Sequence, residues 1–174
     1  MAKQPYHRKN LAAAIQQQAR QQLEESGVEQ LSLRQIARFL AVTPAAVYRH
    51  FPDKASLLAA LRVEFQEELA ATLREGVLDS PNAAAMLRRM VTNILTYAQE
   101  HPQAIAFFLR TPSAVPQSLQ TVVALLAAQQ PDTPPVGRAA PAIWTFLLGT
   151  LVQLPVQSAT VEEVTTQLMR LLRA

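Results

Sequence analysis

The side chains best suited to chemistry in this 174-residue chain lie close together in residues 42–54, VTPAAVYRHFPDK. Tyr48, Arg49 and His50 carry a hydroxyl group, a guanidinium group and an imidazole ring, which can all donate hydrogen bonds. The two prolines of the segment leave room for barely two helical turns. A short helix with three polar tips on its free side is typical of a helix that contacts another molecule.

Catalysis is a poor explanation for these groups. None of the three histidines, His7, His50 and His101, belongs to a recognisable catalytic constellation, and the chain has no cysteine. The sequence also lacks a GxSxG elbow, an HExxH motif and a P-loop. We therefore expect no enzyme activity, no metal site and no cofactor.

A first helix is expected upstream of the 42–54 segment. Its apolar residues recur every fourth position from Leu11 to Leu23, which predicts one buried stripe. Gly27 is expected to end this helix, because glycine readily adopts the left-handed conformation found just after helix ends.

A second, short helix is expected at residues 32–40. Ser32-Leu-Arg-Gln35 has the pattern of a capping box, in which the serine hydroxyl and the glutamine side chain each bind a free backbone amide. Ile36, Ala37 and Leu40 form the apolar stripe that follows.

A third helix is expected within the 42–54 segment itself. Thr43 can cap it, and Pro44 suits its first position, where a proline loses no hydrogen bond. Pro52 restricts the residue before it and ends the helix. Val47 and Phe51, four residues apart, are expected to face inward.

Two short helices joined by a tight turn predict a helix-turn-helix, whose recognition helix places its N-terminal residues against base edges in the major groove. Ala45 and Ala46 are small enough for the backbone to approach DNA closely. Tyr48, Arg49 and His50 occupy the rest of the free face. These residues favour a nucleic-acid contact over a purely structural helix.

Charge supports the same interpretation. Residues 1–54 hold eight Lys and Arg against four Asp and Glu, whereas residues 55–174 hold eight against nine. Arg34 and Lys54 lie at expected helix starts, where the helix dipole disfavours a cation by about 0.3–1 kcal/mol. A phosphate group at these helix starts would compensate both.

Residues 31–61, LSLRQIARFLAVTPAAVYRHFPDKASLLAAL, resemble the DNA-binding domain of TetR-type bacterial transcriptional regulators. The resemblance covers about the first third of the chain. It rests on the Ile-Ala pair, a turn, the Tyr-x-His-Phe run and a lysine before a leucine-rich helix, which are Ile36, Ala37, Tyr48, His50, Phe51 and Lys54. Ala41 departs from the glycine of many relatives, and we expect slightly altered turn geometry there.

The resemblance implies two kinds of DNA contact. The residues expected to hold phosphate groups are Thr43, Tyr48, His50 and Lys54. The residues expected to face bases are Arg34, Pro44, Ala45 and Arg49.

The remainder of the chain is also expected to be helical. Prolines and glycines outline helices at about residues 53–75, 82–100, 102–111, 116–130, 139–155 and 160–173, and the loop expected at Gln130–Gly137 sets the last two apart. Residues 139–161 contain no charged group. A membrane span is a poor explanation, because prolines and glutamines interrupt the apolar run well below the roughly 20 residues that a bilayer requires.

A helix that is apolar on all sides must be buried on all sides. We expect the last two helices to pair with the same helices of a second copy in a four-helix interface, which resembles the usual dimer of the family. The residues expected in this interface are Trp144, Leu148, Gly149, Val152, Val164 and Leu168.

A ligand site is expected in the same region if the protein responds to an effector. Met86, Met90, Asn93 and Tyr97 form one stripe of a helix, an apolar wall with two polar groups, although such a stripe is more often plain core. Candidates from other segments are Phe107, Arg110 and Trp144. The expected ligand is small and apolar or aromatic, and a buried Arg110 would favour a carboxylate-bearing one.

The sequence thus predicts an all-α protein with a helix-turn-helix DNA-binding domain at residues 1–54 and a helical regulatory and dimerisation domain at residues 55–174. The expected function is a ligand-responsive repressor that binds a palindromic double-stranded DNA operator as a homodimer. No export signal or membrane span is recognisable, which agrees with the cytoplasm. The alternative is a helical adaptor that binds proteins and not DNA, although it leaves Arg34, Arg49 and Lys54 unexplained.

Overall fold

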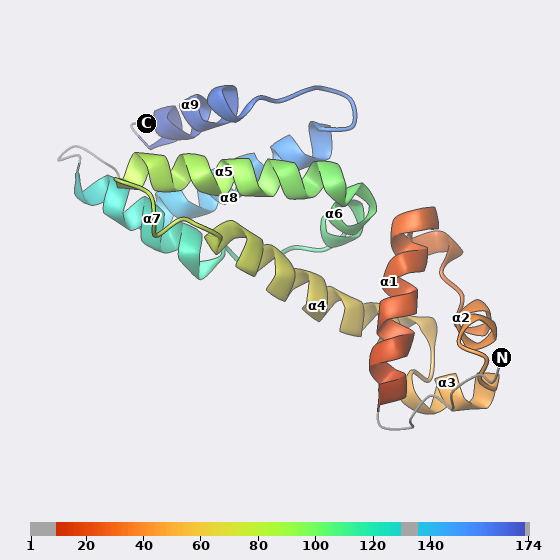
Figure 1. Cartoon of the computed structure of the whole chain (residues 1–174). Coiled ribbons are helices and arrows are strands. Elements are labelled where there is room, and N and C mark those ends of the chain that lie inside the picture. Colours follow the sequence, from red (N-terminus) through yellow and green to blue (C-terminus); the bar gives the residue numbers. More distant parts are fainter. Residues whose placement is uncertain (1–9, 130–135, 173–174) are drawn as a thin grey trace. The chain divides into compact units, whose positions relative to one another are not determined.

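The computed structural model of the chain describes residues 10–129 and 136–172, and the side chains of residues 10–129 and 139–172. Within these ranges every regular element is a helix (Figure 1), which confirms the predicted all-α fold. The chain divides into two compact units, residues 1–66 and 67–174, and the division falls inside helix α4 (Lys54–Arg74). The expected domain boundary after residue 54 stays a prediction.

The first unit begins with helix α1 (Leu11–Gln30). Gly27 leaves the helical conformation with φ 76° and ψ 166°, in the left-handed region of φ that glycine tolerates best. The chain then resumes a last helical turn through Gln30. The helical conformation that begins at Leu11 is thus interrupted at Gly27, where the sequence predicted its end, and only the short turn that follows was not predicted.

Two short helices follow, α2 (Leu33–Phe39) and α3 (Pro44–His50), as predicted. Both pack against α1 and against each other (Figure 1). Their shared core consists of side chains that are almost inaccessible to solvent: Ile15, Ala19, Leu23, Ile36, Ala37, Val47, Leu57 and Leu61. This core fixes the orientation of α3, whose short length would not keep it helical in isolation.

The start of α2 differs from the predicted capping box in one partner. The Ser32 hydroxyl accepts a hydrogen bond from the Gln35 backbone amide at 3.4 Å, as expected. The backbone amide of Ser32, however, donates to the side-chain oxygen of Gln22 in α1, at 3.3 Å. The assignment of this second bond to the Gln35 side chain was wrong, because a residue of a neighbouring helix provides the acceptor.

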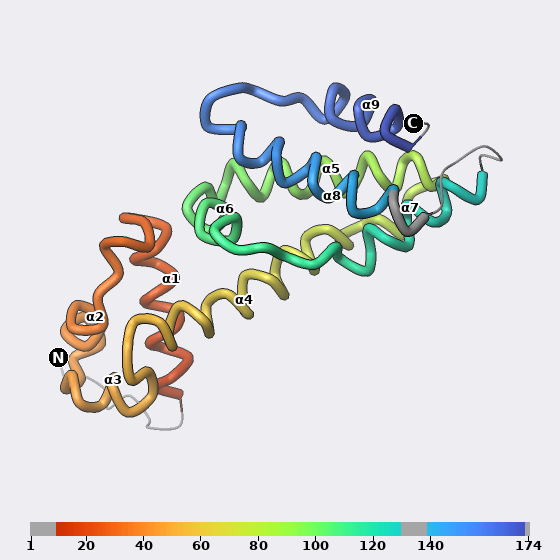
Figure 2. The backbone as a smooth tube through the Cα atoms, turned by 180° about the vertical axis from the view of Figure 1, so that it is seen from behind, coloured from red at the N-terminus to blue at the C-terminus, as the bar shows by residue number. Residues whose placement is uncertain are grey.

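The second unit contains the end of α4 and helices α5 (Ala83–Glu100), α6 (Pro102–Phe108), α7 (Gln117–Ala128), α8 (Val136–Gln153) and α9 (Val161–Leu171). Helix α5 packs against α7 and α9, and α8 packs against the same two helices (Figure 2). These four helices enclose one apolar core, to which α6 adds Ile105 and Phe108. Burial of this core is the main force that holds the unit together.

Several helix ends differ from the sequence prediction. Helix α6 ends at Phe108, three residues before the predicted end, and α8 begins at Val136, three residues before the predicted start. Of the predicted loop at residues 130–137, residues 130–135 lie outside the described part of the chain. The last residue of the predicted helix 160–173 also lies outside it.

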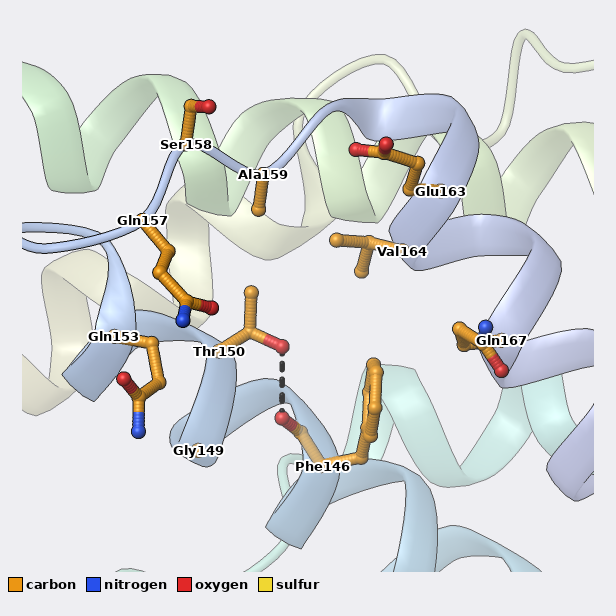
Figure 3. A pocket seen from close by; sticks show the side chains of 10 residues that line it. All are labelled: Phe146, Gly149, Thr150, Gln153, Gln157, Ser158, Ala159, Glu163, Val164 and Gln167. Atoms are coloured by element: carbon orange, nitrogen blue, oxygen red, sulfur yellow. Dashed lines mark hydrogen bonds between the residues drawn. The ribbon is translucent and has the colours of Figure 1, made fainter.

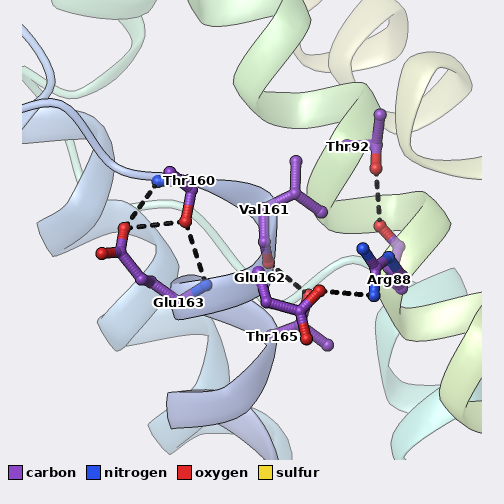
Figure 4. A network of polar contacts seen from close by, with 7 residues as sticks. All are labelled: Arg88, Thr92, Thr160, Val161, Glu162, Glu163 and Thr165. Atoms are coloured by element: carbon purple, nitrogen blue, oxygen red, sulfur yellow. Dashed lines mark hydrogen bonds and ion pairs between the residues drawn. The ribbon is translucent and has the colours of Figure 1, made fainter.

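Helix α9 is fixed at its N-terminus by polar contacts (Figure 4). The Thr160 hydroxyl accepts a hydrogen bond from the Glu163 backbone amide, while the Glu163 carboxylate accepts from the Thr160 amide at 3.0 Å. Next to this capping box, Arg88 of α5 forms an ion pair with Glu162 at 2.6 Å. These contacts attach the start of α9 to α5 at the edge of the core.

Among the residues that the structure describes, no helix has the length and apolar character needed to cross a bilayer.

Candidate nucleic-acid interface

Helix α3 presents one buried and one exposed side. Its N-cap residue Thr43 accepts a hydrogen bond from the Ala46 amide at 3.3 Å, and Pro44 occupies the first helical position. Val47 is completely buried, which fixes the inward side of the helix. The other predicted contact residues of this segment are exposed: Thr43, Pro44, Ala45, Tyr48, Arg49 and His50.

Three of the predicted DNA-contact residues come together in one place. Arg34 at the start of α2, Tyr48 of α3 and Lys54 at the start of α4 line a surface hollow of about 400 Å³. Backbone amides at a helix N-terminus have no partner within the helix and can bind an anion, although Ser32 and Asp53 already bind the amides of Gln35 and Ser56. The hollow therefore combines two helix starts, two cations and a phenol group, which suits a phosphate group of a nucleic acid.

Asp53 also lines this hollow and is the only acidic residue among those described there. Its carboxylate accepts a hydrogen bond from the Ser56 backbone amide at 2.7 Å, and the Ser56 hydroxyl donates to the Asp53 carbonyl oxygen at 2.8 Å. The carboxylate thus acts as a cap for the first turn of α4. This use explains an acidic group beside a surface that otherwise favours anions.

Lys54 has a protein partner that the sequence did not indicate. Its ammonium group donates to the backbone carbonyl oxygen of Glu29, in the last turn of α1, at 2.9 Å. Two residues of α1 thus support the interface. Gln22 is 10 residues from its partner Ser32, and Glu29 is 25 residues from its partner Lys54. No local pattern relates residues at such separations, so sequence reasoning missed them.

Ala41 occupies the turn between α2 and α3 with a φ of 55°. The turn is closed by the Val42 amide, which donates to the Ala37 carbonyl oxygen at 3.0 Å. Ala41 adopts a left-handed conformation of the kind that favours glycine. The departure from the family pattern therefore leaves a residue with a Cβ atom in a strained backbone conformation.

The predicted ligand residues of the described part of the chain differ in their surroundings, and their role in ligand binding stays a prediction. Met90, Tyr97 and Trp144 belong to the apolar core, and Phe107 is buried as well. Met86 is half-buried, and Arg110 is exposed. Trp144 donates from its indole nitrogen to the Ser113 hydroxyl at 3.2 Å. Much of this set therefore serves the packing of the second unit.

Asn93 has a structural role. Its side-chain nitrogen donates to the carbonyl oxygens of Thr72 at 2.9 Å and of Glu75 at 2.8 Å. These carbonyls lie at the end of α4, where backbone acceptors have no partner within the helix. Asn93 and Tyr97 also line a hollow of about 300 Å³ between α4 and α5, together with Thr, Glu and Arg residues.

The predicted interface residues divide into two groups. Trp144, Val164 and Leu168 are buried in the core of their own chain. Gly149 and Val152 are exposed, and Leu148 is half-buried.

Next to the exposed residues lies a hollow of about 520 Å³ between α8 and α9 (Figure 3). Phe146, Gly149 and Thr150 line it from α8, and Glu163, Val164 and Gln167 line it from α9. Its rim carries the carboxamide groups of Gln153 and Gln157.

The first unit has the features that define a class of protein. A short helix is held by a buried core, is entered through a tight turn, exposes its polar tips and lies beside two helix starts with basic side chains. This arrangement is a helix-turn-helix DNA-binding domain.

Residues 15–61 match the family described as bacterial regulatory proteins of the tetR family. The matched residues include the predicted helix-turn-helix, in agreement with the resemblance to the DNA-binding domain of this family. The family consists of DNA-binding regulators, in agreement with the expectation that the chain is no enzyme.

Solved structures of similar fold cover nearly the whole chain. A protein of unknown function from Rhodococcus sp. RHA1 is 28% identical with a TM-score of 0.75, and each chain is covered to 98%. A tetR-family regulatory protein from Rhodococcus RHA1 is 20% identical with a TM-score of 0.69, over 97% of this chain and 98% of that one.

Among curated proteins, the nucleoid occlusion factor SlmA of Marinomonas sp. (strain MWYL1) is 32% identical over 88 residues. The match covers 51% of this chain and 45% of the relative. The chain spans about half the length of the curated relatives it matches.

Proposed function

We propose that the protein is a dimeric transcriptional repressor that binds a palindromic operator in the cytoplasm and is released from it by a small apolar ligand. The observation that carries the proposal is the exposed surface of the first unit. All eight predicted DNA-contact residues lie in this unit, and seven of them are exposed: Arg34, Thr43, Pro44, Ala45, Tyr48, Arg49 and His50.

The surface supports two kinds of DNA contact, with phosphate groups and with base edges. Tyr48 and Lys54 lie in the hollow at the helix starts, where a phosphate group would find both backbone amides and a cation. Arg49 is exposed on the recognition helix outside this hollow, where a guanidinium group could bind a guanine edge with two hydrogen bonds. Contacts of the first kind hold the protein on any DNA, whereas the second kind selects a sequence.

The dimer is proposed to form through the exposed surface of α8 and α9. Gly149 and Val152 are exposed there, and residues 139–161 carry no charge. An added Cβ atom at Gly149 would meet nothing within 4 Å in its own chain. A glycine in the middle of a helix costs about 1 kcal/mol relative to alanine, and close approach of a second helix explains its presence. The hollow of Figure 3 would lie in the same interface and would be filled by the partner.

The ligand is proposed to be uncharged. A carboxylate-bearing ligand was expected only if Arg110 were buried. Arg110 is the only cation among the predicted ligand residues, and it is exposed, so this alternative loses its support. An unpaired charge inside the second unit would be expensive to bury. A neutral apolar molecule is therefore favoured over an acid.

The decisive experiment is the selection of bound fragments from the genome of the source organism. We expect enrichment of sites with two-fold symmetry, with half-sites about one helical turn, or a multiple of it, apart. A mobility-shift measurement on the selected site should then give a much tighter complex than on random DNA. An adaptor without DNA binding would yield no sequence-selective shift.

The similarity to the nucleoid occlusion factor covers about half of each chain. It supports the family assignment and the DNA-binding part of the proposal. No feature of the second unit described above favours a role in nucleoid occlusion for this chain over transcriptional control.

A further inference from the structure

An apolar cleft of about 240 Å³ lies in the second unit, between α6 and the end of α8. Pro102, Ile105 and Ala106 line it on one side, and Leu151 and Val152 line it on the other. All nine side chains of its lining are apolar. The cleft shares no residue with the predicted ligand stripe, and the functions assigned above do not use it.

The cleft exists because its walls include small side chains. Ala98 on α5 and Ala106 on α6 each present a single methyl group where a larger residue would fill the space. Its floor is well covered, since Ala98, Ile105 and Leu151 are between 2% and 6% exposed. Pro102, Ala106 and Val152 are exposed at its mouth, so the cleft is open to solvent. A hollow with a buried apolar floor is therefore suited to an apolar guest.

We propose that this cleft is the ligand site of the second unit and that it binds a small uncharged hydrocarbon of about one ring, such as a monocyclic arene. This inference rests on the proposed ligand response. The volume is sufficient, because a cavity of about 150 Å³ lined by Leu, Ile and Phe already holds benzene. The lining contains no polar or charged side chain, so a hydroxyl or carboxylate group would lose its water without gaining a side-chain partner.

The position of the cleft connects a guest to the proposed dimer. Val152 lines the cleft and is also 56% exposed on the surface of α8 proposed to meet the partner. A guest in the cleft would contact a side chain that the partner subunit is also proposed to contact. Binding can thus favour one geometry of the two subunits over another, which a ligand must do to change DNA affinity.

The test uses the full chain and fluorobenzene, with binding followed by the fluorine relaxation rate. We expect saturable binding that toluene displaces, and phenol or benzoate should compete about tenfold or more weakly than toluene. Ala106→Leu should fill the cleft from an exposed position and abolish binding. Ala84→Leu is the matched control, because Ala84 is an exposed helical alanine of the same unit outside the cleft, and it should bind like the wild type.

Thermal melts followed by circular dichroism will verify that both variants fold. If Ala106→Leu does not fold, Ala98→Val provides a second way to fill the cleft. Absence of saturable binding, equal binding by Ala106→Leu and wild type, or tighter binding of phenol or benzoate than of toluene would each overturn the inference.

DNA affinity, measured on a genomically selected site with and without toluene, separates the two proposals. Binding in the cleft with unchanged DNA affinity would support the ligand site and overturn the ligand response. Intact DNA binding without any guest in the cleft would overturn the ligand site and support the DNA-binding part of the proposed function.

Discussion

The ammonium group of Lys54 binds the carbonyl oxygen of Glu29 at 2.9 Å and so joins the start of α4 to the end of α1. A cation at a helix start is unfavourable, but a cation at a helix end is favourable, and each effect contributes about 0.3–1 kcal/mol. Lys54 has both positions at once. From the sequence, we expected a phosphate group to offset the unfavourable cation at the start of α4. In the structure, the end of α1 already offsets it.

Lys54→Ala should weaken binding to every DNA sequence. Loss of one phosphate contact should lower the slope of log affinity against log salt by roughly one unit. Because the contact with Glu29 is also lost, the melting temperature should fall slightly. Lys54→Arg is the control, since it keeps a cation that can donate to the same carbonyl. A lower melting temperature with an unchanged salt slope would mean that Lys54 only positions α4.

Arg49→Ala should act differently from Lys54→Ala. If Arg49 binds a base edge, its loss should cost about 1–3 kcal/mol on the selected site and much less on random DNA. The resemblance implies the same behaviour for Arg34→Ala, whereas the position of Arg34 in the hollow with Tyr48 and Lys54 favours a phosphate contact and equal losses on both DNAs. Mobility shifts on both DNAs measure the difference. Equal losses on selected and random DNA would refute the assignment of these arginines to bases.

Ala41→Gly should stabilise the protein by roughly 0.5–1 kcal/mol. The left-handed conformation costs a residue with a Cβ atom about 1–2 kcal/mol, and the greater freedom of glycine in the unfolded chain cancels part of the gain. Ala41 is exposed, so no buried contact is lost. Urea denaturation measures the change. Ala59→Gly, at an exposed position inside α4, is the control and should destabilise by about 1 kcal/mol.

Local sequence patterns were sufficient to predict the helix-turn-helix. Thr43, Pro44 and Pro52 fix both ends of α3 through bonds and restrictions within a few residues, and the structure has these ends where predicted. Contacts between distant segments could not be predicted in this way. The acceptor that Gln22 offers to Ser32 depends on how α1 packs against α2, and no spacing along the chain encodes that.

The second unit shows the same limit for its functional residues. The stripe through Met90 and Tyr97 was correctly recognised as apolar, but periodicity does not distinguish a wall of a cavity from plain core. Both residues belong to the core. The sequence did not predict the cleft at Ala98 and Ala106, because a small residue lines a cleft only when the surrounding helices leave space beside it, and the sequence does not give their positions.

Glu163 should make the stability of α9 depend on pH. Hydrogen bonds from the Thr160 backbone amide and then from the Thr160 hydroxyl lower the pKa of this carboxyl group below its ordinary value. Its contribution is therefore complete above the pKa of the unfolded chain and is lost as the pH falls through the lower folded pKa. Glu163→Gln should reduce the fall in melting temperature between neutral and acidic pH.

Two variants of its partner check the cause. Thr160→Ser keeps the hydroxyl and should retain the pH dependence, whereas Thr160→Val removes the hydroxyl and should weaken it. If the melting temperature of Glu163→Gln followed that of the wild type at every pH, the capping box would not contribute to stability.

Gly149→Trp should convert the proposed dimer to a monomer. Gly149 is exposed on α8, and a Cβ atom added there meets nothing within 4 Å in its own chain, so a large side chain should leave the subunit fold intact. It would, however, occupy the space proposed for the partner helix. Gly149→Ala is the matched control. It should stabilise the subunit by up to about 1 kcal/mol through helix propensity and weaken the dimer much less than tryptophan does, because it adds a single methyl group. Light scattering at micromolar concentration measures the mass, and a monomeric wild type or a dimeric Gly149→Trp would show that the interface lies elsewhere or does not form.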